Sequence, residues 1–351
     1  MTQTSLRRQS FETAAVGLVL YAFLSFFYPN DSQVYAGQYM YDYYYGRILE
    51  GRLDLPVRLI SLEGHYLPDG TAYTYHGLAP LLLRFALGWL LPTDGSVFPF
   101  LSPFLWCALG SACYHVILHK IVAARSNESA VAKAAAGRAG LLVWVLSPGL
   151  FLAGNGSFYV EPISIAYAAT GVFFLAVFLN SRGELAYSNA VLVCALCVAL
   201  ALHARLHVAA CLAIALGVFG LRGLFAASVR NLLALAFGVA LVGSSAAGYL
   251  YVNHLKFGDP FEAHAGFSRD DRVQMGTVFL GWEDYSSERA RGFEEFGRFN
   301  LARIPGNLVA YTLDLPNETV HQRIAAFVES REESAGFVRL EPPFIGILPL
   351  W

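Results

Sequence analysis

The sequence predicts an all-α protein: a polytopic bundle of transmembrane helices whose extracytoplasmic loops carry amphipathic helices at the membrane interface. Of 351 residues, 56% are hydrophobic and only 14% are charged, whereas about a quarter of the residues of a soluble domain are charged. The apolar residues also form long runs, and roughly 20 such residues in a helix cross about 30 Å of hydrocarbon. A lipid bilayer is therefore an expected partner. The net charge of −2 gives no basic field to attract nucleic acid.

We predict seven spans, some of which need flanking residues to reach full length. They are Thr13–Tyr28, Pro99–His119, Ala139–Ala153, Tyr159–Leu179, Ala190–Ala204, Val208–Leu221 and Leu232–Val252. Residues 1–252 are therefore expected to form a transmembrane bundle, and residues 253–341 an extracytoplasmic segment. Residues 342–351 are expected to begin a further span, which would make the chain a fragment of a longer protein.

The apolar stretch 78–91 is predicted to be an interfacial or re-entrant helix rather than a span. It is short, contains Arg84 and ends before Pro92. Leaving it out of the spans places the basic residues of the short loops on one side of the membrane. These residues are Arg7, Arg8, Lys120, Arg125, Lys133, Arg138, Arg182, Arg222 and Arg230. Basic loop residues mark the cytoplasmic side, so the N-terminus is expected inside the cell and residues 29–76 outside it.

The first outer loop, residues 29–76, contains the first candidate for chemistry. Asp31 follows the first span directly, where a carboxylate is costly unless it has a partner or a function. A buried acid there could accept the proton of an incoming hydroxyl group; the alternative is that Asn30 or Asp31 only caps a helix. Asp42 lies three helical turns further on, on the same face and roughly 16 Å away. The tyrosines of the loop are expected in the interfacial aromatic belt: Tyr35, Tyr39, Tyr41, Tyr43, Tyr44 and Tyr45.

Metal binding is an open alternative for part of this loop. The residues of suitable type are Glu63, His65, Asp69 and His76. Their spacing matches no strong metal signature, so no cofactor is predicted and a divalent metal is left as an alternative. His76 also precedes an apolar helix, whose N-terminal amides could lie near a phosphate. The C-x-x-C of Cys194 and Cys197 falls inside an apolar run and is expected to pack in the membrane rather than to bind zinc.

Polar residues from three other places are expected on the same outer surface. Glu161 begins the fourth span, Arg205 joins the fifth to the sixth, and Lys256 and Glu262 follow the seventh. Arg205 and Lys256 suit a phosphate group; the alternative is that they extend toward lipid headgroups. The predicted substrate-binding residues are Asp42, His76, Glu161, Arg205, Lys256 and Glu262.

Four stretches carry a resemblance to a known family. They are PNDSQVY with Asp31, GHYLPDGTAYTYHGLAPLL, LSPGLFLAGNGSFYVEPISIAYAA with Glu161, and YVNHLKFGDPFEAHAGF. Together they resemble the GT-C superfamily of integral-membrane glycosyltransferases, which includes the protein O-mannosyltransferases and uncharacterised bacterial relatives. The resemblance implies a GT-C-like bundle in a bacterial inner membrane, a polyprenyl-phosphate-linked sugar as donor, inversion at the sugar carbon, and Asp31 as catalytic base. The chain departs from the family pattern at Asn30, where many members have a second acid.

The expected function is transfer of a sugar from a polyprenyl-phosphate donor to an acceptor at the extracytoplasmic face. Two alternatives belong to other classes. A transporter or flippase for a lipid-linked or small polar substrate would have ionisable residues deep in its spans and helices broken at mid-membrane. A non-catalytic membrane assembly protein would tolerate replacement of Asp31 and Arg205.

Overall fold

The chain divides into two compact units. The first comprises residues 1–65 and 71–266, and the second residues 66–70 and 267–351. The computed structural model describes residues 3–27, 39–60, 64–66, 71–74, 76–125, 130–225, 228–261, 295–296, 301–313 and 318–330. The predicted further span at 342–351 lies outside these residues.

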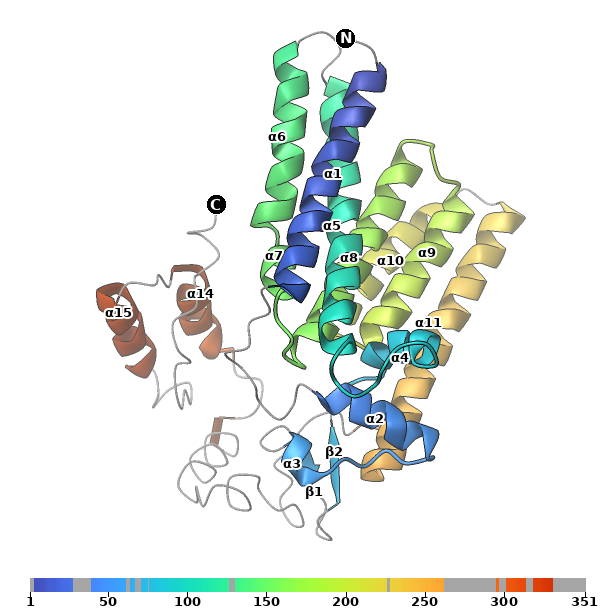
Figure 1. The fold of residues 1–351 in the computed structure, drawn as a ribbon. Coiled ribbons are helices and arrows are strands. Elements are labelled where there is room, and N and C mark those ends of the chain that lie inside the picture. Colours follow the sequence, from blue (N-terminus) through green and yellow to red (C-terminus); the bar gives the residue numbers. More distant parts are fainter. Residues whose placement is uncertain are drawn as a thin grey trace. The chain divides into compact units, whose positions relative to one another are not determined.

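The first unit is a bundle of helices that run side by side (Figure 1). Its helices are α1 (Gln3–Phe26), α5 (Phe98–Arg125), α6 (Ala130–Leu146), α7 (Pro148–Ala153), α8 (Val160–Ser181), α9 (Tyr187–Leu202), α10 (Leu206–Phe225) and α11 (Val229–Phe257). Within the described residues, five helices are long and apolar enough to cross a membrane, namely α1, α5, α8, α10 and α11. The predicted α-helical bundle is therefore confirmed. Two of the seven predicted spans correspond to shorter apolar helices, Gly137–Leu146 and α9.

The predicted third span, Ala139–Ala153, is wrong as a single helix. α6 ends at Leu146 and α7 begins at Pro148, because proline removes a helical amide hydrogen and disfavours helical backbone in the residue before it. Ser147 is accordingly extended, with ψ of 157°. The hydroxyl group of Tyr21 on α1 donates to the Trp144 carbonyl oxygen at 3.1 Å, which satisfies one carbonyl at the end of α6.

Small residues allow α5 and α8 to pack closely. A Cβ atom built on Gly171 of α8 would lie 3.0 Å from the carbonyl oxygen of Gly110 on α5, so the two backbones nearly touch, as is common between helices in membranes. Cys194 and Cys197 of α9 pack with Phe173 of α8 in a buried hydrophobic cluster. Both cysteines are free and buried, in agreement with their predicted packing role.

Short elements gather at the end of the bundle where α5 and α8 begin and α11 ends (Figure 1). They are α2 (Met40–Leu49), α3 (Val57–Ile60), the strands β1 (Gly64–Tyr66) and β2 (Ala72–Thr74), the 3-10 turn η4 (Ala79–Leu81) and α4 (Leu82–Leu87). The two strands form a two-stranded sheet. This polar end, as we call the bundle end formed by these elements, contains the candidate site.

The predicted interfacial helix 78–91 is shorter than expected, since only η4 and α4 are helical and turns follow. Ala79 and Leu81 of this stretch are buried, whereas the apolar residues that follow are largely exposed, among them Phe85 at 49% and Trp89 at 79%. Arg84 lies on the opposite face and is fully buried. An apolar face turned outward suits a helix at a lipid interface.

The prediction places most of the loop tyrosines in the interfacial belt, and two of them do not lie there. Tyr39 and Tyr43 are exposed, but Tyr41 and Tyr44 are buried. Tyr41 and Tyr44 are three residues apart, so they share the face of α2 that packs against the bundle. Tyr35 lies outside the described residues.

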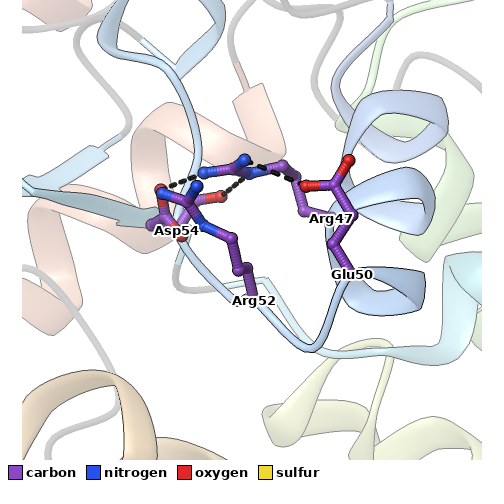
Figure 2. Close-up of polar contacts among 4 residues, drawn as sticks. All are labelled: Arg47, Glu50, Arg52 and Asp54. Atoms are coloured by element: carbon purple, nitrogen blue, oxygen red, sulfur yellow. Dashed lines mark hydrogen bonds and ion pairs between the residues drawn. The ribbon is translucent and has the colours of Figure 1, made fainter.

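A network of ion pairs fixes the end of α2 (Figure 2). Arg47 donates to Glu50 at 3.1 Å, to the Asp54 carboxylate at 2.5 Å and to the Asp54 carbonyl oxygen at 3.3 Å. Arg52 donates to both oxygens of Asp54, at 2.9 and 2.8 Å. These contacts close the turn that follows α2 and so hold the helix that carries Asp42.

The second unit contains α14 (Arg303–Leu313) and α15 (Glu318–Glu329), which pack against each other. Ile324 and Val328 of α15 are buried. The predicted extracytoplasmic segment was expected to begin at residue 253, whereas α11 continues to Phe257.

We predict that Gly77→Ala destabilises the polar end. A Cβ atom on Gly77 would overlap the backbone carbonyl group of His203 in the α9–α10 turn, and the Ala79 amide donates to that same oxygen at 3.0 Å. Such overpacking costs about 1–3 kcal/mol, which a lower thermal midpoint of the detergent-solubilised protein would reveal. Gly46→Ala on α2 is the control, because nothing lies within 4 Å of its added Cβ atom. Equal midpoints for the two variants would contradict the packing described for Gly77.

Candidate functional site

One buried guanidinium group ties three helices together at the polar end. Arg84 of α4 donates from Nε to Asp42 of α2, and from Nη1 to Glu161 of α8 at 2.5 Å. The same Nη1 donates to the Pro80 carbonyl oxygen at 2.7 Å. The side chain of Arg84 is 0% exposed, and those of Asp42 and Glu161 are 2% and 3% exposed. We call these three residues the Arg84 triad.

Each charge of the triad lies at the helix end that favours it. Asp42 and Glu161 occupy the first turns of α2 and α8, where the helix dipole stabilises anions, and Arg84 occupies the last turn of α4, where it stabilises cations. Two aromatic rings complete the surroundings of the guanidinium group, with the centroid of Tyr41 at 5.6 Å and that of Phe98 at 5.2 Å from Cζ. Ring faces at such distances attract a cation.

Burial and the neighbouring charges shift the pKa values of Asp42 and Arg84 in opposite directions. Burial raises the pKa of Asp42, and the neighbouring Arg84 guanidinium opposes this rise without cancelling it. Burial acts to lower the pKa of Arg84, but the two carboxylates outweigh that effect and its pKa is raised. Arg84 is therefore a permanent cation, while the charge of Asp42 depends on its surroundings.

A second buried basic side chain, Lys256 of α11, is held differently. Its Nζ donates to the Thr74 carbonyl oxygen of β2 at 2.9 Å and lies 5.3 Å from the ring centroid of Tyr44. Lys256 is only 3% exposed. Among the residues that the structure describes, no carboxylate forms an ion pair with Lys256. Among the described residues, its polar contacts are thus a peptide carbonyl oxygen and an aromatic ring.

His76 connects Lys256 and the triad with the start of α8. Its backbone amide donates to the Thr74 hydroxyl at 3.1 Å, on the residue whose carbonyl binds Lys256. The His76 ring lies 6.2 Å from the Tyr41 ring and 5.8 Å from the Tyr159 ring. Arg205, which precedes α10, donates to the Tyr159 carbonyl oxygen at 3.1 Å. These contacts form a continuous chain of residues from Lys256 to Arg205.

His203, in the turn between α9 and α10, borders the same site. Its carbonyl oxygen accepts from Ala79, and its ring lies 5.8 Å from that of Tyr249 on α11. Burial lowers the pKa of His203, and the charge of Lys256 acts in the same direction. Among the described residues, Lys256 and Arg205 are then the other basic side chains of this part of the site.

The structure brings five of the predicted site residues together at the polar end: Asp42, His76, Glu161, Arg205 and Lys256. The other two, Asp31 and Glu262, lie outside the described residues, and so does the predicted distance between Asp31 and Asp42. The prediction missed Arg84, although a charged residue inside an apolar stretch is the signal that could have identified it. In the sequence analysis, Arg84 only argues against a transmembrane span at residues 78–91.

Of the four residues considered for a metal site, only His76 has a side chain that the structure describes. Glu63 and Asp69 lie outside the description, and the side chain of His65 is not described either. The described part of the chain has no group of three or more histidine, cysteine, aspartate and glutamate residues able to hold a metal ion.

Comparison with models of protein families, with curated proteins and with solved structures found no match for this chain.

The site therefore separates two kinds of buried charge. The Arg84 triad contains a cation with two carboxylates, which can brace helices but offers no unbalanced positive charge. Lys256, with Arg205 connected to it through Thr74, His76 and Tyr159, offers positive charge without a carboxylate partner in the described residues. Such cations can hold a phosphate or another anionic group.

We predict that Arg84→Met destabilises the protein strongly. The substitution leaves two buried carboxyl groups without their cation, and breaking a buried ion pair from one side costs about 3–5 kcal/mol. Thermal unfolding of the detergent-solubilised protein measures the effect. Arg8→Met is the control, since the Arg8–Glu12 pair is exposed and surface pairs contribute little. Similar midpoints for wild type and Arg84→Met would show that the triad does not brace the polar end.

Proposed function

We propose that this protein is a membrane glycosyltransferase that moves a sugar from a polyprenyl-phosphate donor to an acceptor at the extracytoplasmic face. The observation that best supports the proposal is Lys256, a buried lysine with no carboxylate partner among the described residues, whose ammonium form a bound phosphate would stabilise. A phosphate leaving group gains negative charge as the bond to the sugar breaks, so preplaced cations stabilise the transition state more than the ground state. Lys256 and Arg205 supply that charge.

In the proposed reaction, Asp31 takes the proton of the acceptor hydroxyl group. The hydroxyl oxygen then attacks the anomeric carbon from the face opposite the phosphate, and the bond between that carbon and the phosphate oxygen breaks. The electron pair of this bond leaves with the polyprenyl phosphate, and the configuration at the sugar carbon is inverted. His76 and Glu262 are the residues proposed to contact the sugar.

The Arg84 triad has a supporting role in this proposal. Asp42 and Glu161 both bind Arg84, so they position α2 and α8 rather than contact the substrate. Asp31 precedes Asp42 by eleven residues along the chain, so the triad holds the helix that follows the proposed base in the sequence. The resemblance favours a bacterial cytoplasmic membrane, and the basic residues of the short loops, which share a side with the N-terminus, favour a cytoplasmic N-terminus.

We predict that Asp31→Asn abolishes sugar transfer. An amide cannot accept the proton, and general base catalysis contributes about 100- to 10,000-fold in rate. The assay measures transfer from radiolabelled polyprenyl-phosphate hexoses and pentoses in membranes that contain the protein. Asp259→Asn is the control, because this exposed residue of the polar end has no proposed role in the reaction. Retention of full transfer by Asp31→Asn would exclude Asp31 as the base.

We predict that Lys256→Met lowers sugar transfer about 100-fold, the scale expected when one preplaced charge is lost. Folding should survive, because methionine fills a similar volume and removes a buried charge. Lys120→Met is the matched control, since Lys120 is paired with Glu184 and lies away from the site. Equal transfer rates for the wild type and Lys256→Met would count against phosphate binding by Lys256.

A second candidate function is transport of a lipid-linked or small polar substrate. It is favoured by the break between α6 and α7, beside which the hydroxyl groups of Tyr21, Ser111 and Tyr167 are hydrogen-bonded inside the bundle. Reconstituted vesicles discriminate between the two functions. Movement of the labelled donor across the membrane without any transfer to an acceptor would favour the transporter.

A further inference from the structure

The Arg84 triad has one more acidic group than basic groups. If both carboxyl groups were ionised, the triad would carry a net charge of −1 with side-chain exposures between 0% and 3%. A net charge removed from water to this extent is expensive, and neighbouring carboxyl groups usually avoid it by retaining a proton. The buried site must therefore gain a positive charge or lose a negative one.

Among the described residues, Arg84 is the only cation that forms an ion pair with Asp42 or Glu161. Lys256 is held by the Thr74 carbonyl oxygen and the Tyr44 ring rather than by a carboxylate. Arg205 donates to the Tyr159 carbonyl oxygen.

Asp94, which lies before α5, is a nearby acid whose charge raises the pKa of Asp42 further. The ring of His76, from the segment before η4, lies beside the rings of Tyr41, Phe158 and Tyr159.

The hydrogen bonds of the triad agree with an excess of one carboxyl group over basic groups. Oδ1 of Asp42 accepts from Arg84, whereas Oδ2 is buried without a well-formed hydrogen bond in the described part of the chain; the Gly95 backbone amide is the further donor near this carboxyl group, and its effect on the pKa is smaller than that of burial. Both oxygens of a buried carboxylate normally accept hydrogen bonds. Leaving one anionic oxygen without a donor costs free energy. A neutral carboxyl group leaves much less charge unsolvated at this position.

We propose that Asp42 and Glu161 share one proton at neutral pH, so that the Arg84 triad is electrically neutral. The pair then titrates as one unit rather than as two independent acids. Loss of the proton at higher pH places a net negative charge between α2, α4 and α8. The contact between α2 and the bundle consequently weakens as the pH rises.

The sign of the pH dependence follows from the direction of the pKa shift. Burial raises the pKa of Asp42 in the folded protein, so its contribution to stability is full below the pKa of the unfolded chain, about 3.9 for aspartate. This contribution is lost as the pH rises from there through the raised pKa of the folded state. The thermal midpoint should fall over that interval, and the fall should be smaller in Asp42→Asn.

Infrared spectroscopy of the full-length purified protein tests the proposal directly. A protonated carboxyl group has a C=O stretching band well separated from the carboxylate bands. We expect this band in the wild type at neutral pH, and its loss from both Asp42→Asn and Glu161→Gln. Each substitution leaves one carboxyl group for one guanidinium group, a balanced pair with no need of a proton. Asp94→Asn is the control and should retain the band.

Two outcomes would overturn the proposal. The first is a wild-type spectrum at neutral pH without any protonated carboxyl band, a result that needs no folded variant. The second is a band of unchanged intensity in folded Asp42→Asn and Glu161→Gln, which would assign the proton to another acid. Neither result depends on whether the protein transfers sugars, so the test is independent of the proposed function.

Discussion

The polar end of the bundle depends on the compensation of one buried positive charge. Arg84 lies on a helix of six residues, too short to be stable without tertiary contacts, and its guanidinium group is the link between that helix, α2 and α8. The apolar face of α4 is turned outward as a result. Two carboxyl groups, a peptide carbonyl oxygen and two aromatic rings surround a charge that the apolar bundle could not otherwise contain.

Lys256 is the second buried basic side chain of the polar end. Unlike Arg84, it has no carboxylate partner among the described residues. Lys256 lies in the last turn of α11, where the helix dipole favours positive charge, and it is stabilised by a carbonyl oxygen and a ring. The difference between the two basic side chains gives the site its chemical character. Arg84 is paired with two carboxyl groups, whereas Lys256 and Arg205 have no carboxylate partner among the described residues, and this difference is the basis of the proposed sugar transfer from a phosphate-linked donor.

Sequence reasoning succeeded where local pattern decides the outcome. Apolar runs identified the helices, because a long apolar run needs internal hydrogen bonding in lipid. The break at Pro148 could also have been read locally. Arg84 could not be placed in this way, since its partners lie 42 and 77 residues away in the chain and the buried face of α4 depends on them. Tyr41 and Tyr44 were assigned to the membrane surface for the same reason: their cationic partners come from α4 and α11.

The most direct test of this account is a double-mutant cycle between Arg84→Met and Glu161→Gln, followed by thermal or denaturant unfolding in detergent. If the guanidinium group links α4 to α8 as described, the two substitutions should be strongly non-additive, with a coupling free energy of about 1 kcal/mol or more. Effects that add within about 0.3 kcal/mol would mean that the two side chains do not interact. The Arg84 triad would then not hold the polar end together.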